Sequence, residues 1–153
     1  MNHSIFSRKL TAVAVFLAFS AGASLFAGDT WLTDFEAARE KAAEEEKPML
    51  LDFNGSDWCG WCIKLKKEVF SQEAFQSYAD DELVLVDLDF PRNKPQSDEL
   101  KAQNAALAEK YGVRGFPTII LLSPEGEIIA KTGYRPGGDE AYVEHLQELL
   151  DEA

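Results

Sequence analysis

Two cysteines separated by two residues follow a short apolar run, and this feature restricts the fold of the chain more than any other. The run from Pro48 to Phe53 has the length and apolar character of a buried strand. After Cys59 and Cys62, apolar residues recur at helical spacing: Ile63, Leu65, Val69 and Phe70. The sequence therefore predicts a strand followed at once by a helix, with Cys59 at the helix N-terminus and Cys62 one turn further along.

A cysteine pair in this position is typical of a redox site. The unpaired N–H groups and the positive dipole end of the helix would stabilise a thiolate at Cys59. We expect Cys59 to be the accessible, attacking sulfur and Cys62 to be the resolving cysteine that releases a reduced partner. Gly60 would allow a tight turn here, and Trp58 and Trp61 would offer flat apolar surface to a docking protein.

Three other roles for the cysteines compete with this hypothesis. A structural zinc site needs about four ligands, and beyond His3 near the start the chain offers only Cys59, Cys62 and His145. A purely structural disulfide would close a loop too small to constrain the unfolded chain strongly. Two inert buried thiols are disfavoured by the neighbouring indoles and the helix start. We therefore expect a redox-active disulfide, no metal ion and no further cofactor.

Two segments resemble the thioredoxin-fold family. Asp52-Phe53 followed by Trp58-Cys59-Gly60-Trp61-Cys62 is similar to the thioredoxin active-site strand and motif, with one extra residue in the loop between them. The segment 111–118 is similar to the part of thioredoxins that carries a cis-proline. Lys47-Pro48 and Phe70 make the chain similar to the C-terminal thioredoxin-like domain of periplasmic thiol:disulfide interchange proteins. The resemblance covers roughly residues 31–150 and implies a single α/β domain with a central mixed β-sheet flanked by helices.

The resemblance also implies how a protein partner is bound. Pro117 would form a cis peptide bond and pack against the cysteine sulfurs. The backbone of Gly115 and Phe116 would pair with the partner's chain like an added strand. An ordinary trans proline that opens a strand is the alternative.

Asp52 is expected to serve the resolving cysteine. The matching aspartate of thioredoxins lies beneath the second cysteine, so the resemblance implies that Asp52 exchanges a proton with Cys62, and burial would raise its pKa. A solvated Asp52 that points away from the sulfurs is the alternative. Thioredoxins carry a lysine on the next strand near this aspartate, and the corresponding position here is Leu85.

The N-terminal segment has a different composition. Residues 1–27 contain no acidic residue, carry Arg8 and Lys9 near the start and then become apolar. We interpret residues 1–27 as a secretory signal peptide, cleaved after Ala27 or alternatively after Ala23, and residues 28–153 as the thioredoxin-like domain. An uncleaved anchor that faces the periplasm is the alternative to a periplasmic protein, and only then would the chain contact a membrane.

The remaining pattern predicts further elements and excludes some partners. A capping-box-like Thr33-Asp34-Phe35-Glu36 predicts a helix start. Further helices are expected over 71–78, 98–110 and 139–151, and strands over 82–89, 118–122 and 127–131. The loop 90–97 is longer than in thioredoxins and would either shape partner choice or be a tolerated surface loop. The formal net charge of −12 disfavours nucleic acid as a partner.

The leading hypothesis is an exported thiol:disulfide oxidoreductase that exchanges disulfides with protein substrates. Gly-Trp rather than a His between the cysteines favours a reductase over an oxidase. A reductase outside the cytoplasm would need a membrane-embedded electron donor. The alternatives are a net disulfide oxidase and a thioredoxin-fold peptide-binding or chaperone module without turnover.

Overall fold

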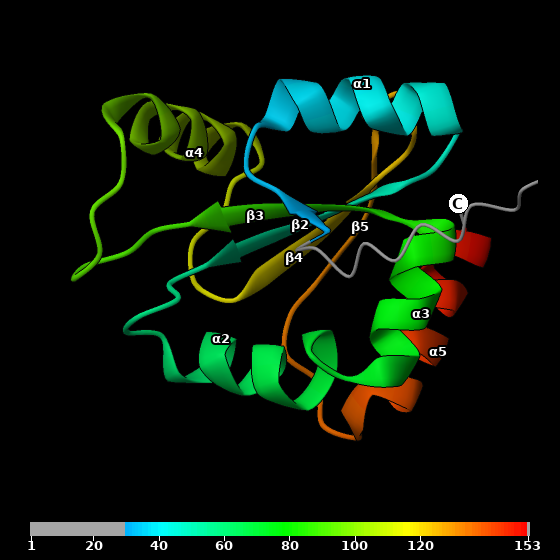
Figure 1. Cartoon of the computed structure of the whole chain (residues 1–153). Helices are drawn as coiled ribbons and strands as arrows, with labels where there is room; N and C mark the ends of the chain where they lie inside the picture. Colours follow the sequence, from blue (N-terminus) through cyan, green and yellow to red (C-terminus); the bar gives the residue numbers. More distant parts are fainter. Residues whose placement is uncertain (1–29, 153) are drawn as a thin grey trace, which may run out of the picture.

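The computed structural model describes residues 30–152 and contains a mixed five-stranded sheet between two layers of helices (Figure 1). The strand order is β1-β3-β2-β4-β5. β1 and β2 both run parallel to β3, whereas β4 runs antiparallel to β2 and β5. The strands are β1 Trp31–Leu32, β2 Met49–Asn54, β3 Val84–Asp89, β4 Thr118–Leu122 and β5 Ile128–Thr132.

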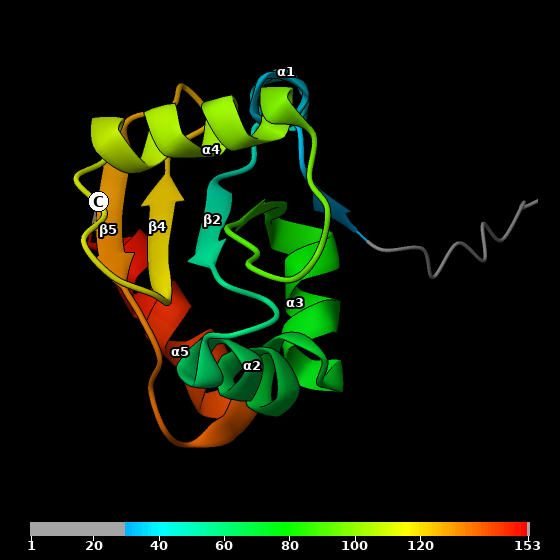
Figure 2. The same ribbon diagram turned by 90° about the vertical axis from the view of Figure 1, so that its left-hand side faces the viewer.

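The helices divide between the two faces of the sheet (Figure 2). α1 (Phe35–Glu45) and α4 (Asp98–Lys110) cover one face. α2 (Gly60–Leu65), α3 (Glu73–Glu82) and α5 (Gly138–Asp151) cover the other. A π-helical segment, η1 (Lys66–Phe70), continues α2 directly. We call these the α1/α4 face and the α2/α5 face.

Alternation along the strands produces one apolar cluster on each face. Met49, Leu51 and Phe53 of β2 lie in the cluster beneath α1 and α4. Leu50 lies in the cluster beneath α2, α3 and α5. Because successive strand side chains point to opposite faces, Asp52 and Asn54 belong to the α2/α5 face. β2, the strand that precedes the cysteines, thus places the polar side chains of Asp52 and Asn54 on the same face of the sheet as the cysteines.

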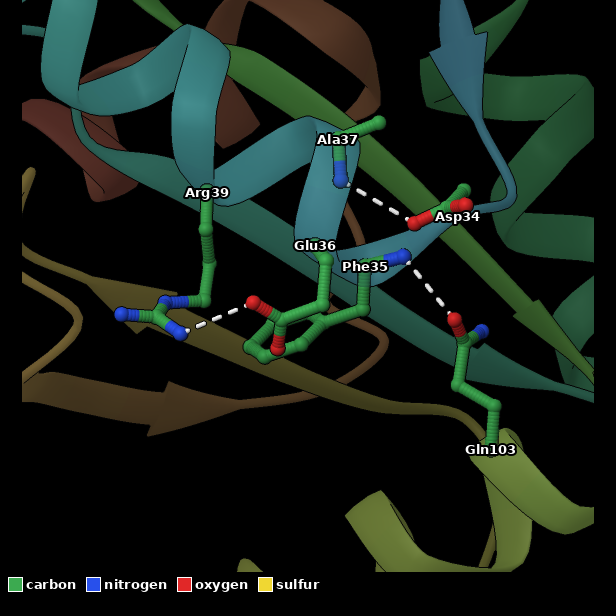
Figure 3. A network of polar contacts seen from close by, with 6 residues as sticks. All are labelled: Asp34, Phe35, Glu36, Ala37, Arg39 and Gln103. Carbon is green, nitrogen blue, oxygen red and sulfur yellow. Dashed lines mark hydrogen bonds and ion pairs between the residues drawn. The ribbon is translucent and has the colours of Figure 1, made fainter.

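The start of α1 is fixed by two side chains (Figure 3). Asp34 is the N-cap, and its carboxylate accepts a hydrogen bond of 3.0 Å from the N–H of Ala37. The N–H of Phe35 donates to the side chain of Gln103 on α4, 3.0 Å away. Glu36 pairs with Arg39 rather than reaching back to Thr33. The expected helix start is confirmed, but Asp34 caps it and a capping box does not form.

Most predicted elements are confirmed within a few residues, and three features differ. The two-residue strand β1 was not expected, because two residues carry no periodic signal. The short helix expected over 71–78 begins at Glu73 and extends to Glu82 as α3. Ile63 is 48% exposed, because Cys62, Leu65 and Val69 form the buried side of the helical segment. The signal peptide predicted for residues 1–27 lies outside the described residues.

Candidate active site

The two cysteines form a disulfide at the start of α2. Their Cα atoms are 5.2 Å apart. Cys59 is the N-cap residue of α2, and its Sγ accepts a hydrogen bond of 3.2 Å from the N–H of Cys62. A helix N-terminus and an N–H donor both favour negative charge on the atom they face. The geometry therefore supports Cys59 as the sulfur that carries negative charge once the disulfide is reduced.

The two cysteines do not differ in exposure. Each is 6% exposed in the disulfide form. The predicted difference in accessibility is therefore not seen in this state. The sulfurs differ in position, because Cys59 caps the helix whereas Cys62 lines a cavity that Asp52 also lines.

The loop before Cys59 depends on Gly55 rather than on Gly60. The N–H of Cys59 donates to the carbonyl of Gly55, 2.8 Å away. A Cβ on Gly55 would lie 2.5 Å from the indole of Trp58, closer than any side chain tolerates. Gly60 begins α2, and a Cβ there would meet nothing within 4 Å. The tight turn predicted for Gly60 is thus wrong, because the close approach occurs five residues earlier.

Trp58 joins three loops instead of lying flat on the surface. Its Nε1 donates a hydrogen bond of 2.7 Å to the carbonyl of Phe90. Its ring meets the ring of Phe116 edge-on at 5.8 Å, and the guanidinium of Arg92 lies 3.6 Å from its centroid. Trp58 is therefore a structural link between the cysteine loop, the loop after β3 and the proline loop before β4.

The loop after β3 is fastened to the cysteine loop. The carboxylate of Asp57 accepts hydrogen bonds from the N–H groups of Arg92 and Asn93, at 2.9 and 2.6 Å. The Arg92 N–H holds the pKa of Asp57 below its usual value. Lys94 donates to the hydroxyl of Ser56 at 3.0 Å. These contacts hold the 90–97 loop against the residues that precede the disulfide, and both interpretations of the loop remain predictions.

Trp61 is the aromatic residue of the motif that remains open to a partner. Its side chain is 58% exposed. It contacts the ring of Tyr134 at 5.0 Å, and the ammonium of Lys64 lies 5.2 Å from its centroid. Tyr134 in turn donates a hydrogen bond of 2.8 Å to Glu68. Trp61 and Tyr134 thus present an aromatic surface at the start of α2.

The proline loop has the conformation that the sequence predicts. The Phe116-Pro117 peptide bond is cis, so the trans alternative is wrong. The hydroxyl of Thr118 donates to the carbonyl of Gly115 at 2.7 Å and closes the turn. A Cβ on Gly133, the residue after β5, would lie 3.2 Å from the carbonyl oxygen of Pro117, so there is little room behind this loop. The predicted binding roles of Gly115, Phe116 and Pro117 remain predictions.

Asp52 lies on the face of the sheet that carries Cys62, so the alternative of an aspartate that points away is wrong. Its Oδ1 is shielded from solvent and accepts no hydrogen bond. Burial raises the pKa of Asp52 well above its usual value, and the nearby Asp87 charge raises it further. Lys66 and the Asn54 side chain act in the opposite direction.

The groups that surround Asp52 were not predicted from the sequence. Asp87 stands directly opposite Asp52 in the β2–β3 register, whereas Leu85 pairs with Leu50. Alternating polar positions at the ends of two neighbouring strands, Asp52 and Asn54 with Asp87 and Asp89, are the signal that could have identified this cluster.

The zinc alternative finds no matching arrangement in residues 30–152. No group of three or more His, Cys, Asp or Glu side chains in this part of the chain is placed to hold a metal ion. His145 lies on α5, 2.9 Å from the hydroxyl of Thr132, and contacts Tyr142. Over the same residues, no helix has the length and apolar character needed to cross a bilayer.

The fold and the cysteine pair define a thioredoxin-like thiol:disulfide oxidoreductase, and the chain belongs to the thioredoxin-like family. The family profile described as a thioredoxin-like domain matches residues 35–147. The disulfide bond reductase DsbH of Chlamydia pneumoniae is 36% identical over 116 residues, which span 76% of this chain and 70% of that protein. A solved structure of a DsbH oxidoreductase matches with a TM-score of 0.76 at 36% identity, covering 79% of this chain and 83% of the other.

A second group of relatives is much longer. The thiol:disulfide interchange protein DsbD of Photorhabdus laumondii is 35% identical over 104 residues, which span 67% of this chain and 16% of that protein. The resemblance to interchange proteins that the sequence predicts is therefore confirmed, as is the single-domain thioredoxin-like fold.

Proposed function

We propose that this protein is an exported reductase of protein disulfides that works through Cys59 and Cys62. The observation that carries the proposal is the disulfide at the start of α2, in which the Cys62 N–H faces the Cys59 sulfur at 3.2 Å. This donor would stabilise the Cys59 thiolate of the reduced protein, and the thiolate is the attacking form of cysteine.

The proposed reaction proceeds in two exchanges. The Cys59 thiolate attacks one sulfur of a partner disulfide, so that a Cys59–partner bond forms and the partner's other sulfur leaves with the electron pair and takes a proton. Cys62 then attacks Cys59, releases the second partner thiolate and restores the Cys59–Cys62 disulfide. Two electrons and two protons pass to the partner. A donor dithiol must then reduce the protein again, and we propose a membrane-embedded donor for an exported enzyme.

The surface around the disulfide supports a protein as substrate. Trp61 and Tyr134 offer exposed aromatic area on one side. On the other side, the backbone of Gly115 and Phe116 precedes the cis Pro117 and would pair with an extended partner segment. Trp58 acts indirectly in this proposal, because it holds Phe116 in place.

The reductase direction is favoured by the residues between the cysteines and by the DsbH relative, which is named a disulfide bond reductase. Equilibration with glutathione measures the direction. A reduction potential near the value of about −270 mV for thioredoxin supports a reductase, whereas one near about −120 mV identifies an oxidant.

An insulin-reduction assay with three proteins tests the function itself. Wild type is expected to turn over, Cys59→Ser to be inactive, and Cys62→Ser to accumulate a mixed disulfide visible by mass spectrometry. Undiminished activity in both variants would refute the enzyme and favour a binding module. N-terminal sequencing of the exported protein tests the location, and a new N-terminus at Gly28 is the expected result.

A further inference from the structure

The register of two parallel strands places two carboxyl groups on neighbouring strands, on the face of the sheet that α2 covers. Asp52 of β2 pairs with Asp87 of β3, and Asn54 pairs with Asp89. Asp52 and Asp87 both line the cavity that Cys62 also lines. Since a shift of one residue would turn a strand's side chains to the other face, this register is what brings the carboxyl groups together.

One amide connects the two carboxyl groups. The Nδ2 of Asn54 donates to Oδ2 of Asp52 at 3.1 Å and to Oδ1 of Asp87 at 2.7 Å. It also lies 3.2 Å from the carbonyl of Asp52. Asn54 is a buried residue. Its two amide hydrogens are therefore already engaged, and this neutral group holds the carboxyl groups close without offsetting two negative charges.

The cavity gives protons a route to the pair. It has a volume of about 700 Å³, enough for several water molecules. Lys66 and Asp80 line it and are exposed, so the cavity reaches the surface. Water in this cavity would connect Cys62, the two carboxyl groups and the solvent.

The charges around Asp52 favour a protonated pair. Burial acts most strongly, followed by the Asp87 charge, and both raise the pKa of Asp52. A charge on Asp87 opposes ionisation of Asp52, because like charges that lie near each other repel. The titratable or charged groups that act on Asp52 or line its cavity are Asp87 and Asp89 of β3, Lys66 of η1, Tyr142 of α5, Asp80 of α3 and Lys94 of the 90–97 loop.

We propose that Asp52 and Asp87 form one proton-holding pair beneath Cys62, in which Asp87 is a positioning residue that determines the pH at which Asp52 accepts the thiol proton of Cys62. The inference rests on the proposed function and adds a second carboxyl group to it. During resolution, the Cys62 proton moves to the Asp52 carboxylate while the Cys62 sulfur attacks Cys59. The Cys59–partner bond breaks, and the partner sulfur leaves with the electron pair and takes a proton from water. The pair then returns its extra proton to the solvent through the cavity.

Stopped-flow kinetics of the reduced protein with a peptide disulfide test the pair. Resolution is the kinetic phase whose rate does not depend on peptide concentration. Its rate is measured by tryptophan fluorescence from about pH 5 to pH 9, because this pH range covers a raised carboxyl pKa. The wild-type rate is expected to rise with pH as Asp52 ionises. Asp87→Asn and Asp87→Ser remove the neighbouring charge, so the midpoint of this rise should fall by about one pH unit or more.

Two further variants separate charge from structure. Lys66→Met removes a charge that favours ionised Asp52, so the midpoint should move to higher pH, and by less, because Lys66 is exposed and screened. Asp80→Asn removes a carboxylate at an exposed part of the same cavity and should leave the midpoint unchanged. A loss of packing alone would not give shifts of opposite sign.

The inference and the proposed function can fail separately. If both Asp87 variants keep the wild-type midpoint, or move it to higher pH, the pair is refuted while Cys59-dependent turnover stands. If Cys59→Ser remains fully active in insulin reduction, the proposed function itself fails. Midpoints that fall in both Asp87 variants and rise in Lys66→Met support the pair.

Discussion

The same three strands present an apolar side to α1 and α4 and a mixed side to α2, α3 and α5. On the α1/α4 face, the buried strand residues are all apolar: Met49, Leu51, Phe53, Val84, Val86, Leu88, Ile120 and Leu122. On the α2/α5 face, Leu50 and Leu85 give way to Asp52 and Asp87 further along β2 and β3. Asp52 and Asp87 therefore lie on the face of the sheet that is covered by the helix that holds the cysteines.

This difference shows how the fold separates stability from chemistry. β2 and β3 are parallel, so their carboxyl ends meet at one edge of the sheet, and the polar positions fall at that edge. α2 begins there, with Cys59 as its N-cap. The α1/α4 face can therefore be closely packed while the α2/α5 face contains a cavity and carboxyl groups that cost stability.

The largest effect on stability is expected on the apolar face. Phe53 is fully buried, and its ring lies 6.4 Å from that of Tyr111. Phe53→Ala should lower the free energy of unfolding by about 3–5 kcal/mol, because it removes a large buried side chain and leaves a cavity. Urea denaturation measures the loss. The disulfide-exchange rate of the protein that remains folded should be unchanged.

Ile128→Ala is the control for this prediction. Ile128 is also a large apolar residue but is half exposed, on β5. Its replacement should change stability by no more than about 0.5 kcal/mol. Equal losses in the two variants would mean that the apolar face is not the better packed one.

The second effect has the opposite sign and lies on the mixed face. Burial and the Asp87 charge raise the folded-state pKa of Asp52 above its unfolded-state value. At pH values between these two pKa values, the folded protein therefore binds more protons than the unfolded protein. The stability of the wild type should therefore fall as the pH rises from about 4 through the raised pKa. Asp52→Asn removes this penalty and should be more stable than wild type at pH 8 by about 1–3 kcal/mol. If Asp52 accepts the Cys62 proton as proposed, turnover of this variant should be slower.

Asp57→Asn provides the contrasting case. The Arg92 N–H lowers the folded-state pKa of Asp57, so this carboxylate contributes stability above its unfolded pKa and loses it as the pH falls through the folded pKa. Asp57→Asn should thus be less stable than wild type at neutral pH, with a difference that shrinks in acid. Denaturation at several pH values measures both variants. A neutral-pH gain in stability for Asp57→Asn, or a loss for Asp52→Asn, would contradict the assignment of the two carboxyl groups.

The fold could be predicted because its signals are local. The cysteine spacing, the apolar run before it and the Phe116-Pro117 segment each lie within a few consecutive residues. The helix over 98–110 has its N-cap at Ser97, whose hydroxyl accepts from the Leu100 N–H at 3.2 Å. The conformation of such segments is determined by residues that are close in sequence, so it can be predicted from the sequence.

The surroundings of the site could not be predicted because they depend on register and packing. Asp87 lies 35 residues from Asp52 in sequence, and only the alignment of β2 with β3 brings it opposite. The contact between Arg92 and Trp58 likewise requires the loop after β3 to fold back over the cysteine loop. A single sequence contains the residues for these contacts but not the strand pairing that brings them together.

The smallest effect on stability is expected in the loop between β2 and Cys59. Gly55→Ala would place a Cβ 2.5 Å from the Trp58 indole, so the ring must move and weaken its hydrogen bond to Phe90. We expect a loss of about 1 kcal/mol and a change in tryptophan fluorescence, because this crowding can be relieved by displacing one side chain. Gly60→Ala is the matched control, since its Cβ meets nothing within 4 Å, and it should leave stability and fluorescence unchanged. If Gly60→Ala proved the more damaging of the two, the turn that positions Cys59 would depend on the motif glycine after all.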